Sequence, residues 1–357
     1  MIQKTVYTPL GSLVLSETDG KICGVHWGHR HHQSDSEALN RASLEIEKYF
    51  SGNLTNFTAP YNLEGTPFQR KVWQAMAEIA YGETVTYGEL ARELNTSARA
   101  VGGACGKNIL PIIIPCHRVL GHENSLGGYS GGDGLLTKSV LLDFEKRAPG
   151  SESSQPIFDG LRRRVPRKPF YFMRHGLTDL NVQHIFQGSG IDAPLNETGH
   201  QQARTAAAGI KTLKDPIIIW HSGLKRTIQT AEHLVSALSS HDVKCVTHDG
   251  LTERSMGALE GTSMKETKKW HPWQSYPEAE TWLQLKNRIS ETFGYILSKE
   301  YQTPPLVVSH GWVGKSLGEL LGLWGPDINM KNCEICYIEP DESSEDSWLY
   351  KRVFAGE

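Results

Sequence analysis

The sequence contains no apolar run long enough to cross a membrane. Its longest apolar stretches, such as Ile112–Ile114 and Ile217–Trp220, are strand-sized and fall far short of the ~20 residues that a membrane helix requires. The N-terminal residues also lack the continuous apolar segment of a secretory signal. Only 6 cysteines are scattered along 357 residues, which excludes a disulfide framework. We therefore expect a cytoplasmic protein with reduced thiols and no membrane partner.

The chain also lacks a large excess of charge of either sign. Its 37 basic and 40 acidic residues give a formal net charge of -3, so any attraction to nucleic acid must come from local clusters. Hydrophobic residues make up 38% and charged residues 22%, which is typical of a folded globular protein. The length predicts two or three domains.

A change of composition marks the expected domain boundary. Residues 149–167 open with Pro, Gly and Ser and close with a basic cluster around Arg162–Arg164, which is typical of a linker. The cluster is also compatible with a nucleic-acid or targeting patch, although most such runs are solvated. We expect a strand-rich subdomain in 1–62, a helical domain in 63–148 and a further domain in 168–357.

The first half predicts strands followed by helices. Residues 4–27 alternate apolar and polar side chains around Gly and Asp turns, a pattern of antiparallel strands. Thr66 and Pro67 predict a helix N-cap followed by proline in the first turn, and Gly82 suits a left-handed turn beyond that helix. The expected apolar face of the helix consists of Phe68, Val72, Trp73, Met76 and Ile79.

The next segments predict a helix-turn-helix motif. Residues 87–94 form a short amphipathic helix, and after a capped turn residues 98–107 form a second one. Gly102 and Gly103 leave the second helix almost bare, so it can approach a surface closely. With Arg99 at its start, that surface is either DNA or, in the simpler interpretation, a neighbouring helix.

A candidate nucleophile follows an apolar run. We expect Ile112–Ile114 to be a buried strand that presents Cys116 beside His117 and Arg118. Both cationic neighbours favour the thiolate, so the pKa of Cys116 is expected to be lowered. Taken alone, a cysteine next to a histidine is also common in inert cores.

The motifs of the first half resemble one enzyme family. The segments TPFQRKVWQAMAEIAYGETVTYGELA, ARAVGGACGKN, IIIPCHRV and GGYSGG, within about residues 1–148, are similar to the methylated-DNA-protein-cysteine methyltransferases. The resemblance implies a small strand-rich, ribonuclease H-like subdomain followed by a helix-turn-helix alkyltransferase domain. It also implies irreversible transfer of an alkyl group from O6-alkylguanine in double-stranded DNA to the protein, without a cofactor.

The resemblance assigns the transfer to three residues. Cys116 would accept the alkyl group, His117 would take the thiol proton through a water, and Glu145 would orient His117. A turnover hydrolase of the Cys-His type remains the alternative. Recovery of free enzyme after many turnovers would support that alternative.

Five further residues match the family's DNA-binding positions. Arg99 would fill the gap left by a flipped base, and Tyr87 would press on the adjacent phosphate. Asn108 would brace the turn that carries the acceptor cysteine, and Tyr129 and Ser130 would form a lid over the flipped base.

A cluster near the N-terminus has metal-compatible spacing. Cys23, His26 and His29 are followed by His31 and His32, but no fourth ligand is evident. Some members of the family bind a structural zinc there. This chain has no cysteine near position 5, so we expect no required metal.

Three apolar runs of the second half end in reactive residues. Phe170–Met173, Ile217–Trp220 and Leu306–Val308 are each followed by a helical pattern, as in an open parallel sheet whose carboxyl edge carries the ligand site. The residues expected to meet at this edge are Arg174, His175, Ser222, Arg226 and His310. Two guanidiniums suit a phosphate group, which a histidine can then attack. Taken singly, each His-Gly pair is also compatible with a turn or a core histidine.

As an ordered set, the motifs resemble a second family. RHGLTDLN, QGSGIDAPLNETGHQQA, SGLKRTIQTA, LTERSMGALEG and VVSHG, within about 168–357, are similar to the histidine phosphatases, the phosphoglycerate mutase-like family. This implies a three-layer α/β/α domain with a mainly parallel sheet. His175 would be phosphorylated, with Arg174, Arg226 and His310 as its phosphate pocket and Glu253 as proton donor. Thr178 and Asn181 would line the rim.

The short segment between Glu253 and His310 favours a phosphatase of an unknown small phosphorylated substrate over a mutase, since mutases of this family carry a longer insertion. Its aromatic residues form either a substrate wall or part of the core: Trp270, Trp273, Tyr276 and Trp282. The whole chain would then be a multidomain α/β protein with two activities. The alternative is a damage-sensing module in which one half binds its ligand without turnover.

Overall fold

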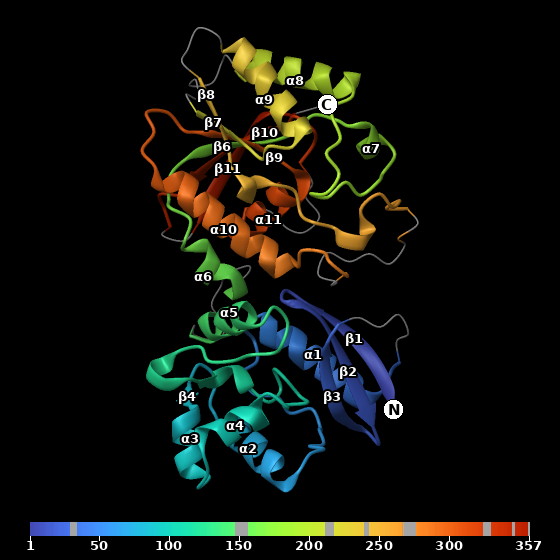
Figure 1. Cartoon of the computed structure of the whole chain (residues 1–357), viewed down its shortest axis with the longest axis vertical. Helices are drawn as coiled ribbons and strands as arrows, with labels where there is room; N and C mark the ends of the chain where they lie inside the picture. The colour runs from blue at the N-terminus through green and yellow to red at the C-terminus, as the bar shows by residue number, and fades with distance from the viewer. Residues whose placement is uncertain are drawn as a thin grey trace. The chain divides into compact units, whose positions relative to one another are not determined.

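The computed structural model describes residues 1–28, 34–146, 156–210, 218–238, 243–265, 267, 276–323, 330–344 and 347–355. Two compact units are present, the first formed mainly by Met1–Gly160 and the second mainly by Leu161–Trp270 and Leu285–Glu357 (Figure 1). Among the described helices, none combines the length and the apolar character needed to cross a membrane.

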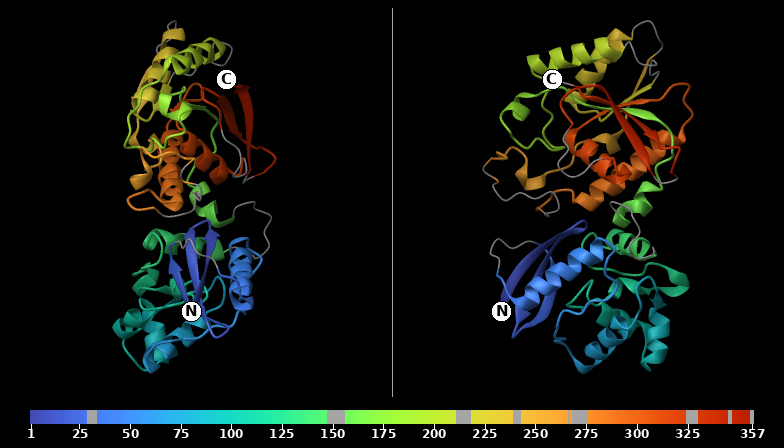
Figure 2. Two further views of the ribbon diagram at one scale, coloured as in Figure 1. Left: turned by 90° about the vertical axis from the view of Figure 1, so that its right-hand side faces the viewer. Right: turned by 180° about the vertical axis from the view of Figure 1, so that it is seen from behind.

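The first unit begins with a three-stranded antiparallel sheet. Strands β1 (Ile2–Thr8), β2 (Gly11–Thr18) and β3 (Lys21–Trp27) pair in sequence order, which confirms the expectation for residues 4–27. Helix α1 (Glu37–Phe50), which was not anticipated, is capped by Ser36 and lies against this sheet (Figure 2). The backbone N–H of Val25 in β3 donates to Ile109 O at 2.8 Å, which ties the sheet to the helical region.

The helical region carries the expected helix-turn-helix. Helix α2 (Pro67–Ala77) starts with a capping box at Thr66, and α3 (Tyr87–Glu93) and α4 (Ala98–Cys105) follow. The region also contains β4 (Val85–Thr86) paired with β5 (Val119–Leu120), the 3-10 turns η1 (Cys116–Arg118) and η2 (His122–Asn124), and helix α5 (Leu135–Glu145). On the expected α2 face, Phe68 is 38% exposed and so does not belong to the core.

The prediction of a strand at Ile112–Ile114 is wrong. These residues are buried, but Ile112 has a φ of 74° and the N–H of Ile114 bonds back to Leu110 O at 2.7 Å, so the chain forms a tight turn. Burial of three isoleucines was correctly inferred. Their β-branched side chains suggested a strand because burial and strand propensity give the same short apolar pattern.

Part of the segment expected as a linker has regular structure. The 3-10 turn η3 (Pro156–Phe158) and helix α6 (Asp159–Arg162) lie within it, and Ile157 is buried. The basic residues that follow bond to the second unit: Arg164 to Asn287, and Arg167 to three backbone carbonyls. These side chains therefore favour a structural interpretation of the basic cluster.

The second unit is a three-layer α/β/α domain. Its sheet has the order β11-β10-β6-β9-β7-β8. Strands β6, β9, β7 and β8 are parallel to one another, and β10 pairs antiparallel with both of its neighbours, β6 and β11. The strands are β6 (Phe170–Arg174), β7 (Ile218–His221), β8 (Lys244–Thr247), β9 (Leu306–Ser309), β10 (Ile335–Pro340) and β11 (Trp348–Phe354). The predicted runs near 170, 218 and 306 are thus the three adjacent central strands.

Helices cover both faces of this sheet (Figure 1). On one face, α8 (Glu197–Ile210) and α9 (Lys225–Ala237) pack on a core that includes Met173 and Val308. On the other, α10 (Trp282–Ser298) brings Phe293 to 5.2 Å from the ring of Phe170, and α11 (Gly311–Leu321) contacts β6. The unit is completed by the short helix α7 (Asp179–Val182) and the 3-10 turns η4 (Asp249–Leu251) and η5 (Gly257–Leu259).

Candidate functional sites

The first candidate site is the turn that carries Cys116. Asn108 Nδ2 donates to Ile114 O at 2.8 Å, and its Oδ1 accepts from Leu110 N at 3.0 Å, so one amide holds both ends of the turn. Cys116 begins the 3-10 turn η1 and is half-buried. Asn108 therefore lies where the sequence expected a brace for the cysteine.

A buried ion network lies beside this cysteine. Glu145 Oε1 lies 2.9 Å from His117 Nε2 and accepts a hydrogen bond from Tyr49 at 2.6 Å, while Arg118 binds both carboxylate oxygens at 2.7 and 2.9 Å. Burial alone would raise the pKa of Glu145, but His117 and Arg118 hold it well below its usual range. A carboxylate can only accept, so His117 Nε2 carries the proton and Nδ1 keeps its lone pair. His117 Nδ1 is buried and has no hydrogen-bond partner among the described residues.

The expectation of a lowered pKa for Cys116 is wrong. Burial raises the pKa of this thiol, against the lowering effects of its hydrogen bond with Asn108 and of the Lys138 charge. The guanidinium of Arg118, which the sequence placed beside the thiol, is instead paired with Glu145. The resting cysteine is therefore favoured as a neutral thiol that needs a base.

The remaining recognition residues surround the same turn. Arg99 is exposed in the first turn of α4, and Ser130 is exposed in the loop before α5. Tyr87 starts α3, and its hydroxyl approaches Gly128 O of that loop at 3.4 Å. The hydroxyl of Tyr129 is buried and has no hydrogen-bond partner among the described residues. Burial is the main cause that raises the pKa of Tyr129, and the nearby Cys116 raises it further.

The sequence analysis missed three residues that contact the Cys116 site. Tyr49 comes from α1, and Lys138 is a fully buried lysine whose Nζ donates to Val119 O at 2.6 Å. Trp27, at the end of β3, reaches the lid, since a Cβ at Gly131 would lie 2.6 Å from its indole nitrogen. No local sequence signal predicts these contacts because each joins segments far apart in the chain.

The cysteine and histidines near the N-terminus were considered as possible metal ligands. Within the described ranges, no three His, Cys, Asp or Glu side chains gather as potential metal ligands. Cys23 instead donates to Ser16 O at 3.5 Å, and His26 is exposed. His29, His31 and His32 lie outside the described residues.

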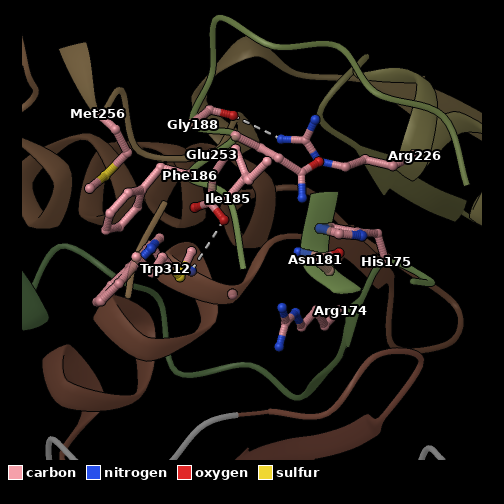
Figure 3. A pocket seen from close by; sticks show the side chains of 13 residues that line it. Arg174, His175, Asn181, Ile185, Phe186, Gly188, Arg226, Glu253, Met256 and Trp312 are labelled. Carbon is pink, nitrogen blue, oxygen red and sulfur yellow. Dashed lines mark hydrogen bonds between the residues drawn. The ribbon is translucent and has the colours of Figure 1, made fainter. Parts of the chain in front are cut away.

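The second candidate site is a cavity of about 230 Å³ at the carboxyl edge of the sheet (Figure 3). Its polar lining includes Arg174 from β6, His175 just beyond it, Arg226 from α9 and Glu253. Arg226 is held by the carbonyls of Ile191 and Gly188, each at 2.9 Å. Arg174 donates to Met330 O at 2.7 Å, while its buried Nε has no described partner.

His175 is arranged as a neutral base. Its Nδ1 lies 2.7 Å from Gly176 O, and because a carbonyl only accepts, Nδ1 carries the proton and Nε2 keeps the lone pair. Burial, followed by the charges of Arg226 and Arg174, lowers the pKa of His175 well below its usual value. Asn332 also supports the loop by donating to His175 O at 2.8 Å.

His310 lies behind His175. The two rings are 5.1 Å apart in an edge-to-face arrangement, which brings the two predicted histidines together. Its Nδ1 faces Arg226 Nε at 3.3 Å and its Nε2 lies 2.7 Å from the Ser222 hydroxyl. His310 is not part of the cavity lining, so its present contacts orient Arg226.

Glu253 lines the cavity as a buried acid. Its oxygens accept hydrogen bonds from the backbone N–H groups of Arg254 at 2.9 Å and of Trp312 at 3.4 Å. Burial nevertheless raises the pKa of Glu253, which favours the protonated form. A protonated carboxyl beside two guanidiniums can deliver a proton.

The two expected rim residues differ in position. Asn181 lines the cavity, whereas Thr178 is fully buried and caps α7 in a capping box with Asn181. Thr178 therefore supports Asn181 from behind. Asn196, just before α8, accepts a hydrogen bond from Gly199 N at 2.9 Å.

The structure supports the core interpretation for one of the four aromatic residues. Trp282 is buried and does not line the cavity, Tyr276 does not line it either, and Trp270 and Trp273 lie outside the described residues. The aromatic lining instead comes from Phe186 and Trp312. Other lining residues not singled out are Ile185, Gln187, Gly188, Met256, Met264 and Gly311.

Comparisons with known proteins match the two halves separately. The model of the "Histidine phosphatase superfamily (branch 1)" matches residues 170–351. Models of the "6-O-methylguanine DNA methyltransferase" match its ribonuclease-like domain to residues 1–63 and its DNA binding domain to residues 67–147.

Named relatives follow the same division. A methylated-DNA-protein-cysteine methyltransferase of Haemophilus influenzae is 45% identical over 134 residues, covering 36% of this chain and 74% of the relative. The crystal structure of Mycobacterium tuberculosis OGT in complex with DNA is 41% identical and covers 42% of this chain and 95% of its own, with a TM-score of 0.38. A mycobacterial glucosyl-3-phosphoglycerate phosphatase is 21% identical and covers 52% and 98%, with a TM-score of 0.45.

Proposed function

Because the first half of this chain belongs to the methylated-DNA-protein-cysteine methyltransferase family and the second half to the histidine phosphatase superfamily, we propose that one polypeptide carries both reactions. The first is DNA repair by transfer of an alkyl group from O6-alkylguanine to Cys116. The second is hydrolysis of a phosphate monoester through a phosphohistidine on His175. We place both in the cytoplasm, and the domain limits 1–62, 63–148 and 168–357 remain part of the proposal.

The observation that carries the repair reaction is the His117–Glu145 pair next to Cys116. In the proposed reaction, a water passes the thiol proton to His117 Nδ1, which lacks a described partner. The thiolate attacks the alkyl carbon, the bond from that carbon to O6 breaks, and its electron pair stays on the guanine. Glu145 stabilises the resulting imidazolium.

The DNA contacts follow from the helix-turn-helix. The exposed Arg99 at the start of α4 would fill the stack after the damaged base leaves it, with Tyr87 beside the adjacent phosphate. Tyr129 and Ser130 would cover the extruded base, and the unpartnered Tyr129 hydroxyl supports this role. Asn108 keeps the acceptor turn in place.

The observation that carries the phosphatase reaction is the lining of one cavity by His175, Arg174 and Arg226, with His175 Nδ1 held by Gly176 O so that Nε2 keeps its lone pair. Its Nε2 would attack phosphorus while Arg174 and Arg226 bind the phosphoryl oxygens, including through the unpartnered Arg174 Nε. Glu253 would protonate the leaving alcohol, and water would then release phosphate from His175. Asn181 would line the phosphate pocket, while Thr178 and His310 would support it by holding Asn181 and Arg226 in place.

Two experiments test these assignments. The intact mass of the protein after incubation with duplex DNA containing O6-methylguanine should increase by one methyl group, and unchanged mass would contradict the repair reaction. A phosphatase screen over nucleotides, sugar phosphates and phosphoproteins tests the second half. If one half only binds its ligand without turnover, that half should fail its own test, and a mutase would transfer phosphate between two alcohols rather than to water.

A further inference from the structure

The cavity around His175 has two chemically different ends. Figure 3 shows Arg174, His175 and Arg226 on one side and Met256, Phe186 and Trp312 on the other, with Glu253 between them. The apolar residues that line the cavity, which we call the apolar wall, are Ile185, Phe186, Met256, Met264 and Trp312. A phosphate bound at the arginines therefore directs its ester group towards apolar side chains.

Backbone hydrogen bonds between two segments hold part of the apolar wall in place. Phe186 N donates to Thr262 O at 3.0 Å, Gly261 N donates to Phe186 O at 2.8 Å, and Met264 N donates to His184 O at 2.8 Å. This ladder holds Phe186 and Met264 on the same side of the cavity. The wall is thus part of the fold.

The described lining of the cavity places its cationic side chains away from the apolar wall. Among the described residues that line the cavity, the only lysine or arginine side chains are Arg174 and Arg226, both at the phosphate end. The Glu260 carboxylate accepts from Met256 N of the wall at 3.0 Å, and Glu253 accepts from Trp312 N at 3.4 Å. Lys315 lies 5.2 Å from the Trp312 ring centre but is not a lining residue.

From this arrangement we propose that the phosphatase site takes monophosphate esters of apolar, uncharged alcohols, with an aromatic or branched aliphatic group seated on the wall. A second anionic group, such as the carboxylate of a phosphoglycerate, would lose its hydration there without gaining a cation. This inference rests on the proposed phosphatase function.

The test uses the full chain and three esters. Benzyl phosphate and glycerol phosphate release alcohols of similar basicity, so their difference reports binding of the alcohol part, while 3-phosphoglycerate adds a carboxylate. We expect kcat/KM to be about tenfold or more higher for benzyl phosphate than for either of the others. Equal or faster turnover of glycerol phosphate or 3-phosphoglycerate would overturn the inference.

Two variants sharpen the comparison. Met264 is 40% exposed at the wall, so Met264→Lys adds a cation with little risk to folding and should raise kcat/KM for 3-phosphoglycerate relative to benzyl phosphate. Val182→Lys is the matched control, since Val182 is 56% exposed and does not line the cavity, and it should leave that ratio unchanged. An unchanged ratio in Met264→Lys, or an equal shift in both variants, would contradict the role of the wall.

Failure of the underlying function has a separate signature. An activated ester, p-nitrophenyl phosphate, should phosphorylate His175 whatever the alcohol preference. If no phosphohistidine forms and no ester is hydrolysed, the proposed phosphatase function fails and this inference with it. If His175 is phosphorylated but the wall shows no preference, only this inference fails.

Discussion

Glu145 Oε1 accepts a hydrogen bond from His117 Nε2 at 2.9 Å, and the same carboxylate neutralises the buried Arg118. One residue therefore sets the tautomer of the base and stabilises the core. Glu145→Gln should slow alkyl transfer, because the imidazolium loses its counter-charge. It should also cost about 3 kcal/mol or more of stability, since Arg118 is left as an unpaired buried charge.

Calorimetry of the full chain measures this loss of stability. If the two units unfold in separate transitions, only the transition of the first unit, which contains Glu145, should shift. The pH dependence has a defined sign: the folded pKa of Glu145 is lowered, so its contribution is complete above the unfolded pKa of roughly 4.3 and is lost as pH falls. A Glu145→Gln variant as stable as the parent at pH 7 would contradict the network.

Cys116→Ser should abolish alkyl transfer, because a hydroxyl is a far weaker nucleophile of nearly the same size. Cys105→Ser is the matched control, since Cys105 is buried against Met76 and burial raises its pKa to about 12. Intact mass after reaction with methylated DNA distinguishes the two variants.

Because the pKa of Cys116 is also raised, the transfer rate of the parent protein should rise with pH above 7. A rate that falls with pH would indicate that Cys116 is already a thiolate in the resting protein.

Gly131→Ala should slow transfer by displacing the lid. Its new Cβ would lie 2.6 Å from Trp27 Nε1 and 2.9 Å from the Tyr129 ring, so the loop or the indole must shift. Gly128→Ala, in the same loop, meets nothing within 4 Å and should be close to the parent. Single-turnover rates decide, and a double variant with Trp27→Ala should recover part of the loss. Equal rates for both single variants would remove Trp27 from the site.

Arg99→Ala should reduce repair of duplex DNA more than transfer from free alkylguanine, because only the duplex has a stack to refill. Lys21→Ala also removes an exposed charge, from β3, and serves as the control for net charge. The ratio of the two transfer rates is the measurement. Equal losses on both substrates in Arg99→Ala would place its role elsewhere.

His175→Ala should remove the acid-labile phosphoenzyme and nearly all hydrolysis, and EDTA should leave the parent rate unchanged because the arginines supply the positive charge.

Glu253→Gln should slow the hydrolysis of alkyl esters more than that of p-nitrophenyl phosphate, whose leaving group needs little protonation. Since the pKa of Glu253 is raised, hydrolysis of alkyl esters should decline only as pH rises through that higher value. Equal slowing of both ester types would contradict the role of Glu253 as the proton donor.

The sequence by itself determined those features that depend only on residues close together in the chain. Thr66 and Pro67 specify the start of α2, and the runs before Arg174 and Ser309 predicted strands of a parallel sheet whose ends hold the histidines. The ordered motifs identified both families. Such features depend on local caps, periodicity and spacing, which one segment carries by itself.

Tertiary structure decided what depends on distant segments meeting. Burial raised the pKa of Cys116 where its neighbours in sequence implied the opposite, because Arg118 turned to Glu145. Packing also made a turn of Ile112–Ile114, moved Thr178 behind the cavity and brought Trp312 into it. Desolvation and side-chain contact are set by the full three-dimensional environment, so no single stretch of the chain could reveal them.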